Sequence, residues 1–346
     1  MKKHAIIPIF VPHLGCPHDC VFCNQRSITA REEAPDAAKL RDTAESWLST
    51  LGFLPPSEIE MAFYGGSFTG LALDEQNYYL DIAAEYKAEG RIGKIHLSTR
   101  PDYIDERILD NLKAHSVDTV ELGVQSFDEE VLRLSERGHT ASDAVRAAGL
   151  IKAYGMELGI QLMIGLPGDS LEKCVYSAKK AAALSPALAR LYPTVVLKGT
   201  RLYEDYLSGK YIAPTKDEML LRTKEMYKIL DDAGIYIMRV GLKSTELISE
   251  GSDAVASGYH PAYRQLIEDA IARERIDEML STIEYANKEM RQSVTLYANR
   301  YSYGNLFGHK GENRRYFKER YPLLDFSFAK DDELKNNRYR LEYQNA

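Results

Sequence analysis

Three cysteines stand within eight positions of one another. Cys16, Cys20 and Cys23 follow the spacing C-x3-C-x2-C. Three thiolates on one short loop can bind three irons of a four-iron cubane cluster, which leaves the fourth iron open to an outside ligand. An open iron beside a pocket indicates catalysis rather than electron storage. The alternative is a zinc site completed by His13 or His18, although no second ligand pair follows at the spacing of structural zinc.

Glycine-rich and polar segments follow several other apolar runs. They are Gly65-Gly66-Ser67, Ser98–Arg100, Gln125-Ser126 and Gly165–Gly168. Glycine allows the backbone to approach a ligand closely, and exposed N–H and C=O groups can bind an amino-acid zwitterion. These segments are therefore candidate ligand-binding turns.

Strand-like and helix-like stretches alternate for about 240 residues. The strand-like runs are Ala5–Val11, Glu58–Tyr64, Lys94–Leu97, Thr119–Val124, Glu157–Ile164 and Ala189–Val196. The helical stretches are Ala37–Leu51, Asp74–Lys87, Asp105–Ala114 (with Asp105 as N-cap), Ser142–Tyr154, Leu171–Leu184 and Lys216–Ala233. About six βα units predict an α/β fold with a parallel sheet and helices outside it. The pattern does not separate a partial (β/α)6 barrel from an open doubly wound sheet, but both bind ligands at the carboxyl ends of the strands.

Composition narrows the class of protein. The chain has 346 residues, of which 45% are hydrophobic and 27% charged, and its net charge is −7. These values exclude a disordered chain or a polycation. No window approaches 18 uncharged apolar residues, and the start of the chain lacks the features of a signal peptide. With only four cysteines, the chain is expected to be cytoplasmic, and Cys174 is expected to be a small core residue.

The cysteine loop, with Phe22 before its last cysteine, resembles that of the radical S-adenosylmethionine (SAM) superfamily. The resemblance implies a 4Fe-4S cluster bound by Cys16, Cys20 and Cys23. It also implies SAM as a second cofactor, which the cluster cleaves reductively to give a 5′-deoxyadenosyl radical. A low-potential flavodoxin or ferredoxin is the implied electron donor.

Longer motifs resemble two families within that superfamily, over roughly residues 5–245. Three runs resemble the radical domain of the Elongator catalytic subunit, which modifies wobble uridine in tRNA: Thr99-Arg100-Pro101-Asp102-Tyr103, Glu121–Phe127 and Glu136–Thr140. Gly123–Phe127, Arg137–Thr140 and Leu162–Gly168 also resemble oxygen-independent coproporphyrinogen III oxidases.

These matches imply a set of cofactor contacts. Gly65 and Gly66 would face the methionine amino group of SAM, Gln125 the ribose, and Arg137 the carboxylate, to which an arginine fork is suited. The alternative for Arg137 is an exposed charge at a helix end. The full set of cofactor-binding candidates is Gly65, Gly66, Ser67, Ser98, Gln125, Arg137 and Gln161.

Two of these candidates depart from the porphyrin enzymes. Ser98 stands where those enzymes carry a glutamate on the ribose, and Gln161 where they carry an aspartate. Both departures argue against a porphyrin substrate. The last ~100 residues are too few for the acetyltransferase domain of the Elongator subunit and show no glycine-rich acetyl-CoA loop, so acetyl-CoA chemistry is not expected.

The sequence divides into residues 1–245, the expected radical SAM barrel, and residues 246–346, an α+β appendage. Residues 286–346 contain 12 Lys/Arg and 8 Asp/Glu, a balance of +4, and 11 of these 61 residues are Phe or Tyr. Gly308-His309-Lys310-Gly311 leads into a basic helix and then a strand-like run, Leu324–Phe328, which is similar to the core of a KH domain.

Lys310, Arg314 and Arg315 would then offer positive charge to RNA phosphates. The alternatives are a packed cap whose charges are simply solvated, and an ordinary turn between helices. The leading interpretation is a radical SAM enzyme that modifies RNA, with tRNA as its substrate. A porphyrin-type radical enzyme for small molecules and a non-catalytic iron–sulfur RNA-binding redox sensor stay open as alternatives.

Overall fold

The chain divides into two compact units. The structure is a computed structural model, which describes residues 4–11, 20–23, 34–242, 254–257, 260–282 and 292–344. The first unit consists of Met1–Arg222 and Ile229–Tyr259, and the second of Thr223–Lys228 and His260–Ala346. The helix α9 (Lys216–Asp232) therefore contributes residues to both units.

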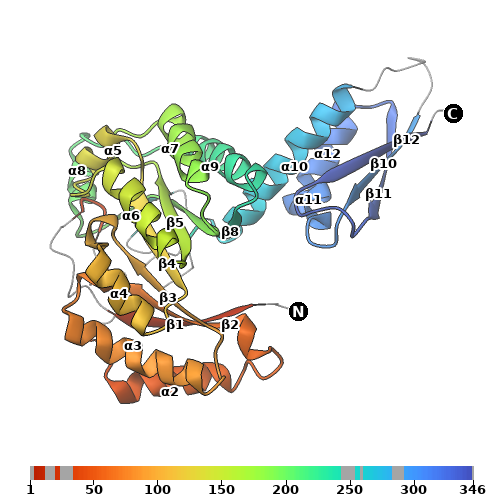
Figure 1. Cartoon of the computed structure of the whole chain (residues 1–346). Coiled ribbons are helices and arrows are strands. Elements are labelled where there is room, and N and C mark those ends of the chain that lie inside the picture. Colours follow the sequence, from red (N-terminus) through yellow and green to blue (C-terminus); the bar gives the residue numbers. More distant parts are fainter. Residues whose placement is uncertain are drawn as a thin grey trace. The chain divides into compact units, whose positions relative to one another are not determined.

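The first unit is built on a seven-stranded parallel sheet. Its order is β1-β2-β3-β4-β5-β6-β8, so neighbours in space are also neighbours along the chain. The strands are β1 (Ala5–Val11), β2 (Ile59–Gly65), β3 (Lys94–Thr99), β4 (Thr119–Gln125), β5 (Glu157–Ile164), β6 (Leu188–Pro193) and β8 (Tyr236–Val240). The sheet curves into a half-barrel with helices on its outer side (Figure 1).

Helices alternate with these strands, as parallel neighbours require. They are α2 (Ala37–Leu48), α3 (Leu73–Ala88), α4 (Glu106–Ala114), α5 (Glu129–Leu134), α6 (Ala141–Ala153), α7 (Leu171–Ala183), α8 (Arg201–Leu207) and α9. Most begin at a side-chain cap. Asp105 was predicted to cap α4, and its carboxylate accepts a hydrogen bond from the Ile108 N–H at 2.8 Å.

The strands present their apolar side chains to the helices on alternate positions. In β2, Met61 and Phe63 are fully buried; in β3, Ile95 and Leu97 are too. Burial of such side chains contributes about 1.5–3 kcal/mol each to folding. The other alternate positions point into the half-barrel and carry most of its polar residues, so the same alternation that forms the core also lines the interior.

The predicted fold class is confirmed, with one addition. The sequence predicted six strands, but Tyr236–Val240 adds a seventh beside β6. The run predicted as one strand over Ala189–Val196 is broken after Pro193, and Val195–Leu197 (β7) pairs instead with β9 (Ala254–Ser257) in a separate two-stranded sheet.

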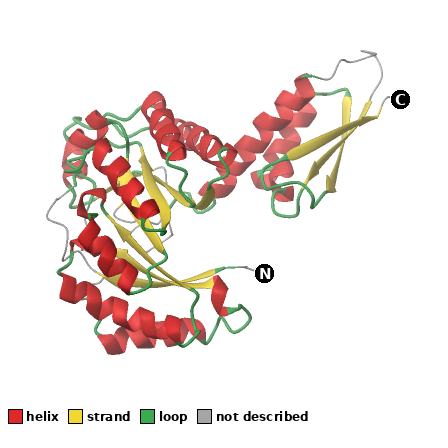
Figure 2. Ribbon diagram, viewed as in Figure 1, coloured by secondary structure: helices red, strands yellow, loops and turns green. Residues whose placement is uncertain are grey.

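The second unit contains a small three-stranded sheet with helices on one face (Figure 2). Its elements are α10 (Tyr263–Ser281), β10 (Gln292–Ala298), α11 (Tyr303–Phe307), α12 (Glu312–Arg320), β11 (Leu324–Lys330) and β12 (Tyr339–Gln344). The central strand β10 is parallel to β11 and antiparallel to β12. Buried Leu296, Leu306 and Phe317 join the sheet to the helices. The predicted basic helix and the following strand are thus both present.

Across the ranges that the structure describes, no helix is long and apolar enough to cross a membrane.

Candidate functional site

The turn after β2 brings two strands into close backbone contact. Gly65 has a φ of 119°, and a Cβ built on it would lie 2.3 Å from the Val11 carbonyl oxygen. Only glycine fits there without moving β1. The Gly66 N–H donates to the same oxygen at 3.1 Å. A small hollow opens beside this turn, lined by Val11, Tyr64, Gly66, Ser67, Phe68 and Leu71.

Hydroxyl groups tie the turn after β2 to the turn after β3. The Ser67 Oγ lies 2.8 Å from the Thr99 Oγ1 and accepts a hydrogen bond from the Arg100 N–H at 3.2 Å. The Thr69 hydroxyl bonds to the same Thr99 oxygen at 2.6 Å and donates to the Tyr103 carbonyl. Because these bonds engage its hydroxyl, Ser67 holds the two turns together, and its contact with a cofactor stays a prediction.

The described part of the cysteine loop is a tight turn fixed at both sides. The Cys23 N–H donates to the Cys20 carbonyl at 2.9 Å. Val21 between them is buried, donates to the Ser135 carbonyl and accepts from the Leu202 N–H at 2.7 Å. The two cysteines are thereby held in place by backbone bonds to distant segments. Cys16, His13 and His18 lie outside the described residues.

Arg137 connects this turn to the end of β4. The residue is only 6% exposed. Nη1 donates to the Cys20 Sγ at 3.1 Å, and Nη2 donates to the Gly123 carbonyl at 2.6 Å. The alternative of an exposed charge at a helix end is therefore wrong. The structure instead places a buried cation against a cysteine sulfur.

Two buried polar atoms at this end of β4 have no hydrogen-bond partner among the described residues. They are the Arg137 Nε and the Gln125 Oε1. Gln125 has a φ of 66° and lies at a break in the pairing of β4 with β5. A buried donor and acceptor without partners are costly, by ~1–3 kcal/mol each. Arg137 contacts the cysteine turn directly, and the role of both side chains toward a cofactor stays a prediction.

His139 is held neutral beside these cations. Burial, together with the charges of Arg137 and Arg100, lowers its pKa to about 3. Its Nε2 lies 3.2 Å from the Val124 carbonyl and therefore carries the proton. The neutral ring adds no further positive charge to the site.

Ser98 and Gln161 meet inside the half-barrel. The Gln161 Nε2 donates to the Ser98 Oγ at 2.8 Å and also to the Glu121 carboxylate. The two positions that were predicted to distinguish this chain from the porphyrin enzymes are thus hydrogen-bonded partners. Both side chains are partly exposed, and their role toward a cofactor stays a prediction.

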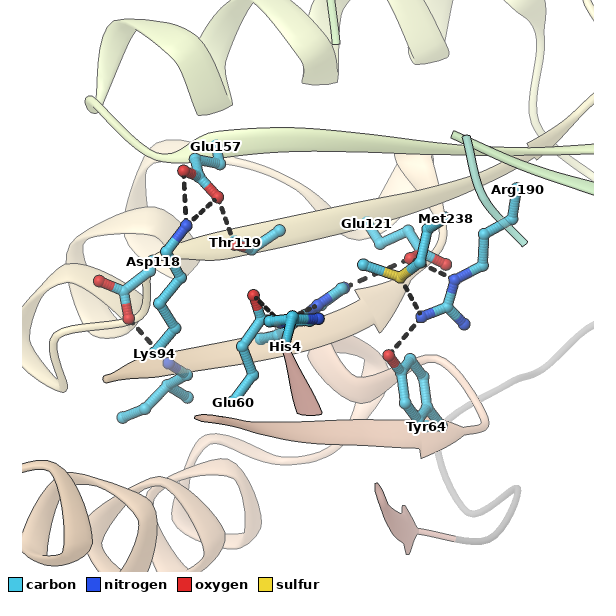
Figure 3. Close-up of polar contacts among 12 residues, drawn as sticks. His4, Glu60, Tyr64, Lys94, Asp118, Thr119, Glu121, Glu157, Arg190 and Met238 are labelled. Carbon is cyan, nitrogen blue, oxygen red and sulfur yellow. Dashed lines mark hydrogen bonds and ion pairs between the residues drawn. The ribbon is translucent and has the colours of Figure 1, made fainter. Parts of the chain in front are cut away.

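Glu121 connects this pair to a buried network of charged side chains from four strands (Figure 3). The fully buried Glu121 pairs with the Arg190 Nε at 3.0 Å and with the His96 Nε2 at 3.3 Å. His96 also pairs with Glu60, and Arg190 donates to the Tyr64 hydroxyl while its guanidinium lies 4.6 Å from that ring's centre. The charges of this network compensate one another inside the barrel.

The pairs shift the pKa values of these groups. Burial raises the pKa of Glu60, but hydrogen bonds from His4 and His96 outweigh it and hold that pKa at about 2. Burial lowers the pKa of His96, but Glu121 and Glu60 outweigh it and raise that pKa. Glu121 stays ionised because Arg190 and His96 lower its pKa against burial.

The network of Glu60, His96, Glu121 and Arg190 was missed from the sequence. The available signal was a charged residue at alternate positions of otherwise apolar strands, as in Glu121-Leu-Gly. Cys174, in contrast, is buried in α7 as predicted. The predicted RNA contacts Lys310, Arg314 and Arg315 are all exposed in the second unit.

Two family models match the chain between residues 10 and 273. Residues 10–181 match the family model of the Radical SAM superfamily, and residues 186–273 match that of the Radical_SAM C-terminal domain. The tRNA uridine(34) acetyltransferase of Methanocaldococcus infernus is 28% identical over 253 residues, which are 62% of this chain and 47% of that protein. Human Elongator complex protein 3 is 31% identical over 175 residues, 44% of this chain and 32% of that protein.

A solved structure has the same fold. The archaeal Methanocaldococcus infernus Elp3, with an N-terminal deletion, superposes with a TM-score of 0.64 at 21% identity, over 80% of this chain and 64% of that one. The chain spans about half the length of the acetyltransferase that it matches.

Proposed function

The chain belongs to the radical SAM superfamily, and on that premise we propose that it is a radical enzyme that modifies tRNA. The single observation that carries the radical-enzyme part of this proposal is the contact between Arg137 and the Cys20 sulfur. It brings a predicted cofactor residue and a predicted cluster ligand together across 117 positions of sequence.

The described residues fit the cluster that the superfamily implies. Cys20 and Cys23 are held on one turn, and thiolates are the ligands of such clusters. We propose that both bind a 4Fe-4S cluster together with Cys16. When bound, the cluster supplies the electron that cleaves SAM to methionine and a 5′-deoxyadenosyl radical. Arg137, by donating to Cys20, would stabilise negative charge on that ligand.

The end of the sheet also fits SAM. The close approach at Gly65 leaves no room for a side chain, and the Gln125 Oε1 and Arg137 Nε have no hydrogen-bond partner among the described residues. We propose that the Gly65–Gly66 turn holds the methionine part, that Gln125 accepts a hydrogen bond from a ribose hydroxyl, and that Arg137 uses its Nε for the carboxylate. Enclosure inside the half-barrel would keep water away from the radical.

The substrate proposal comes from the relatives. The curated relatives described above are a tRNA uridine(34) acetyltransferase and an Elongator complex protein. We propose a tRNA nucleoside as the substrate, a flavodoxin or ferredoxin as the electron donor, and the cytoplasm as the location. Ser98 and Gln161, hydrogen-bonded to one another, line the interior where such a nucleoside would enter.

Two measurements test the proposal. Protein reconstituted anaerobically with iron and sulfide, then given dithionite and SAM, should release 5′-deoxyadenosine, and an Arg137→Met variant should release far less. Mass spectrometry of tRNA nucleosides from cells that lack the protein should show one missing modification. No 5′-deoxyadenosine would favour the redox sensor, and an unchanged set of tRNA nucleosides would favour a small-molecule substrate.

A further inference from the structure

We infer that the second unit binds a single-stranded segment of RNA along a strip that runs from the Gly308–Gly311 turn to the edge strand β11. This inference rests on the proposed function, because it names how a tRNA substrate would be held. It concerns residues beyond 273, where neither family model matches.

The turn has a backbone that few residues can adopt. Gly308, Lys310 and Gly311 have φ values of 72°, 51° and 76°. A Cβ on Gly308 would lie 2.8 Å from the backbone nitrogen of Asn313, at the start of α12. The glycine thus lets the turn pack directly against the following helix, and Lys310 takes a left-handed conformation that is uncommon for a residue with a side chain.

Side chains on the protein side hold this turn rigid. The Asp269 carboxylate of α10 accepts a hydrogen bond from the His309 N–H at 2.6 Å. The fully buried Asn313 donates to the backbone carbonyls of Asp269 and Asn305, both at 2.8 Å. Because these hydrogen bonds already fix the turn, binding of a ligand to Lys310 would cost little further backbone conformational entropy.

An aromatic strip continues from the turn to the edge of the sheet. Phe307, the residue before Gly308, lies 4.7 Å from Phe328 of β11, measured between ring centres. Phe307 also lies 5.4 Å from Tyr303, and the Lys330 ammonium is 5.1 Å from the centre of the Tyr303 ring. The three residues pack against the core of this unit with one part of their surface and stay partly exposed with the rest, and β11 forms one edge of the described sheet. Partly exposed rings beside cations are what stacked, unpaired bases require.

The charge along the strip suits a polyanion. Residues 308–330 contain six Lys/Arg against three Asp/Glu, although the chain as a whole is negative. Lys310, Arg314 and Arg315 are exposed, and the Arg315 guanidinium donates to the Lys310 carbonyl at 2.8 Å. Lys310 lies within the rigid turn, and Phe307 directly precedes it in the chain. In the inferred complex, phosphates meet the cations of the turn and unpaired bases stack on the rings, which a single strand allows because its bases are free to unstack from one another.

Binding of RNA to the full chain tests this inference without radical chemistry. The probe is a fluorescein-labelled ten-nucleotide single-stranded RNA, measured by fluorescence anisotropy without SAM or reductant at several salt concentrations. Lys310→Gln and Arg314→Gln should each weaken binding about 5-fold at 0.1 M salt and lower the salt slope by ~0.7. Lys335→Gln is the matched control, because Lys335 is exposed in the same unit but lies between β11 and β12.

The ring contribution needs its own variant. Phe328→Leu keeps an apolar side chain at this position of the strip but removes the ring. It should weaken RNA binding about 5-fold or more, while the circular dichroism spectrum stays unchanged. Each of three results would overturn the inference. They are equal affinity for duplex and single-stranded RNA, equal effects of Lys335→Gln and Lys310→Gln, and unaltered RNA binding by a folded Phe328→Leu variant. If 5′-deoxyadenosine is not released but these binding differences are found, the proposed radical function fails and the RNA strip stands.

Discussion

Replacement of Gly65 by alanine tests the geometry on which the cofactor site depends. The new Cβ would lie 2.3 Å from the Val11 carbonyl oxygen, and the residue would have to keep a φ of 119°. The strained backbone costs about 1–3 kcal/mol, and displacement of β1 costs a similar amount. We therefore expect the free energy of unfolding to fall by about 2–6 kcal/mol.

Gly52 provides a matched control within the same unit. A Cβ on Gly52 would meet no atom within 4 Å, so Gly52→Ala should change stability by less than ~0.5 kcal/mol. For a unit of this size, roughly 2 °C per kcal/mol gives a melting temperature about 4–12 °C lower for Gly65→Ala. Thermal denaturation followed by circular dichroism measures the difference. The reasoning is refuted if the two variants melt at the same temperature.

A second readout separates the turn's ligand role from its structural role. At a temperature where the Gly65→Ala variant is folded, calorimetric titration with SAM should show weaker binding than in Gly52→Ala. The displaced turn can no longer present its N–H and C=O groups to the methionine part. Undiminished affinity in a folded variant would show that SAM does not contact this turn.

Three further predictions concern buried charge. Arg137→Met should shift the midpoint potential of the reconstituted cluster to a more negative value, because a charge-assisted hydrogen-bond donor to Cys20 is lost. A redox titration followed by electron paramagnetic resonance measures the shift, and an unchanged potential would assign the guanidinium to SAM alone. Glu121→Gln should destabilise the first unit by ~3–5 kcal/mol in urea denaturation, since Arg190 and His96 lose their shared carboxylate, and the double variant Glu121→Leu with Arg190→Met should recover part of that loss. The pKa of His139 is lowered from 6.5 to about 3, so as the pH falls from 6.5 toward 3 only the unfolded state takes up the proton, and the folded state loses up to ~5 kcal/mol of stability. His139→Gln should flatten the dependence of melting temperature on pH in that window, and an identical dependence would contradict the buried neutral ring.

The elements that could be predicted were those with a local pattern in the sequence. Alternating strand-like and helical runs are enough to predict parallel βα units, and Asp105 before a helical run is enough to predict a cap. The seventh strand was missed because Tyr236–Val240 is short and carries Arg239 and an exposed Tyr236. The sequence of such a run does not differ from that of a loop, and only its pairing with β6 makes it a strand.

The site was predictable as a set of residues but not as a set of contacts. Cys20 and Arg137 could be singled out from motifs, yet nothing in the sequence places them 3.1 Å apart. Glu121 and Arg190 are on strands separated by β5, and their pairing depends on the curvature of the sheet. Long-range ion pairs of this kind have no local signal, because either residue alone looks like a charge misplaced in an apolar strand.

The helix α9 limits how this protein can be divided for study. Its residues Thr223–Lys228 belong to the second unit, where the Tyr227 hydroxyl donates to Glu268 and accepts from the Asn337 amide, and where Lys224 and Lys228 both pair with Glu274. A fragment that starts at residue 246 would lack all of these partners and leave Glu274 without its two lysines. An isolated C-terminal fragment should accordingly aggregate or melt early unless a peptide covering α9 is supplied in trans.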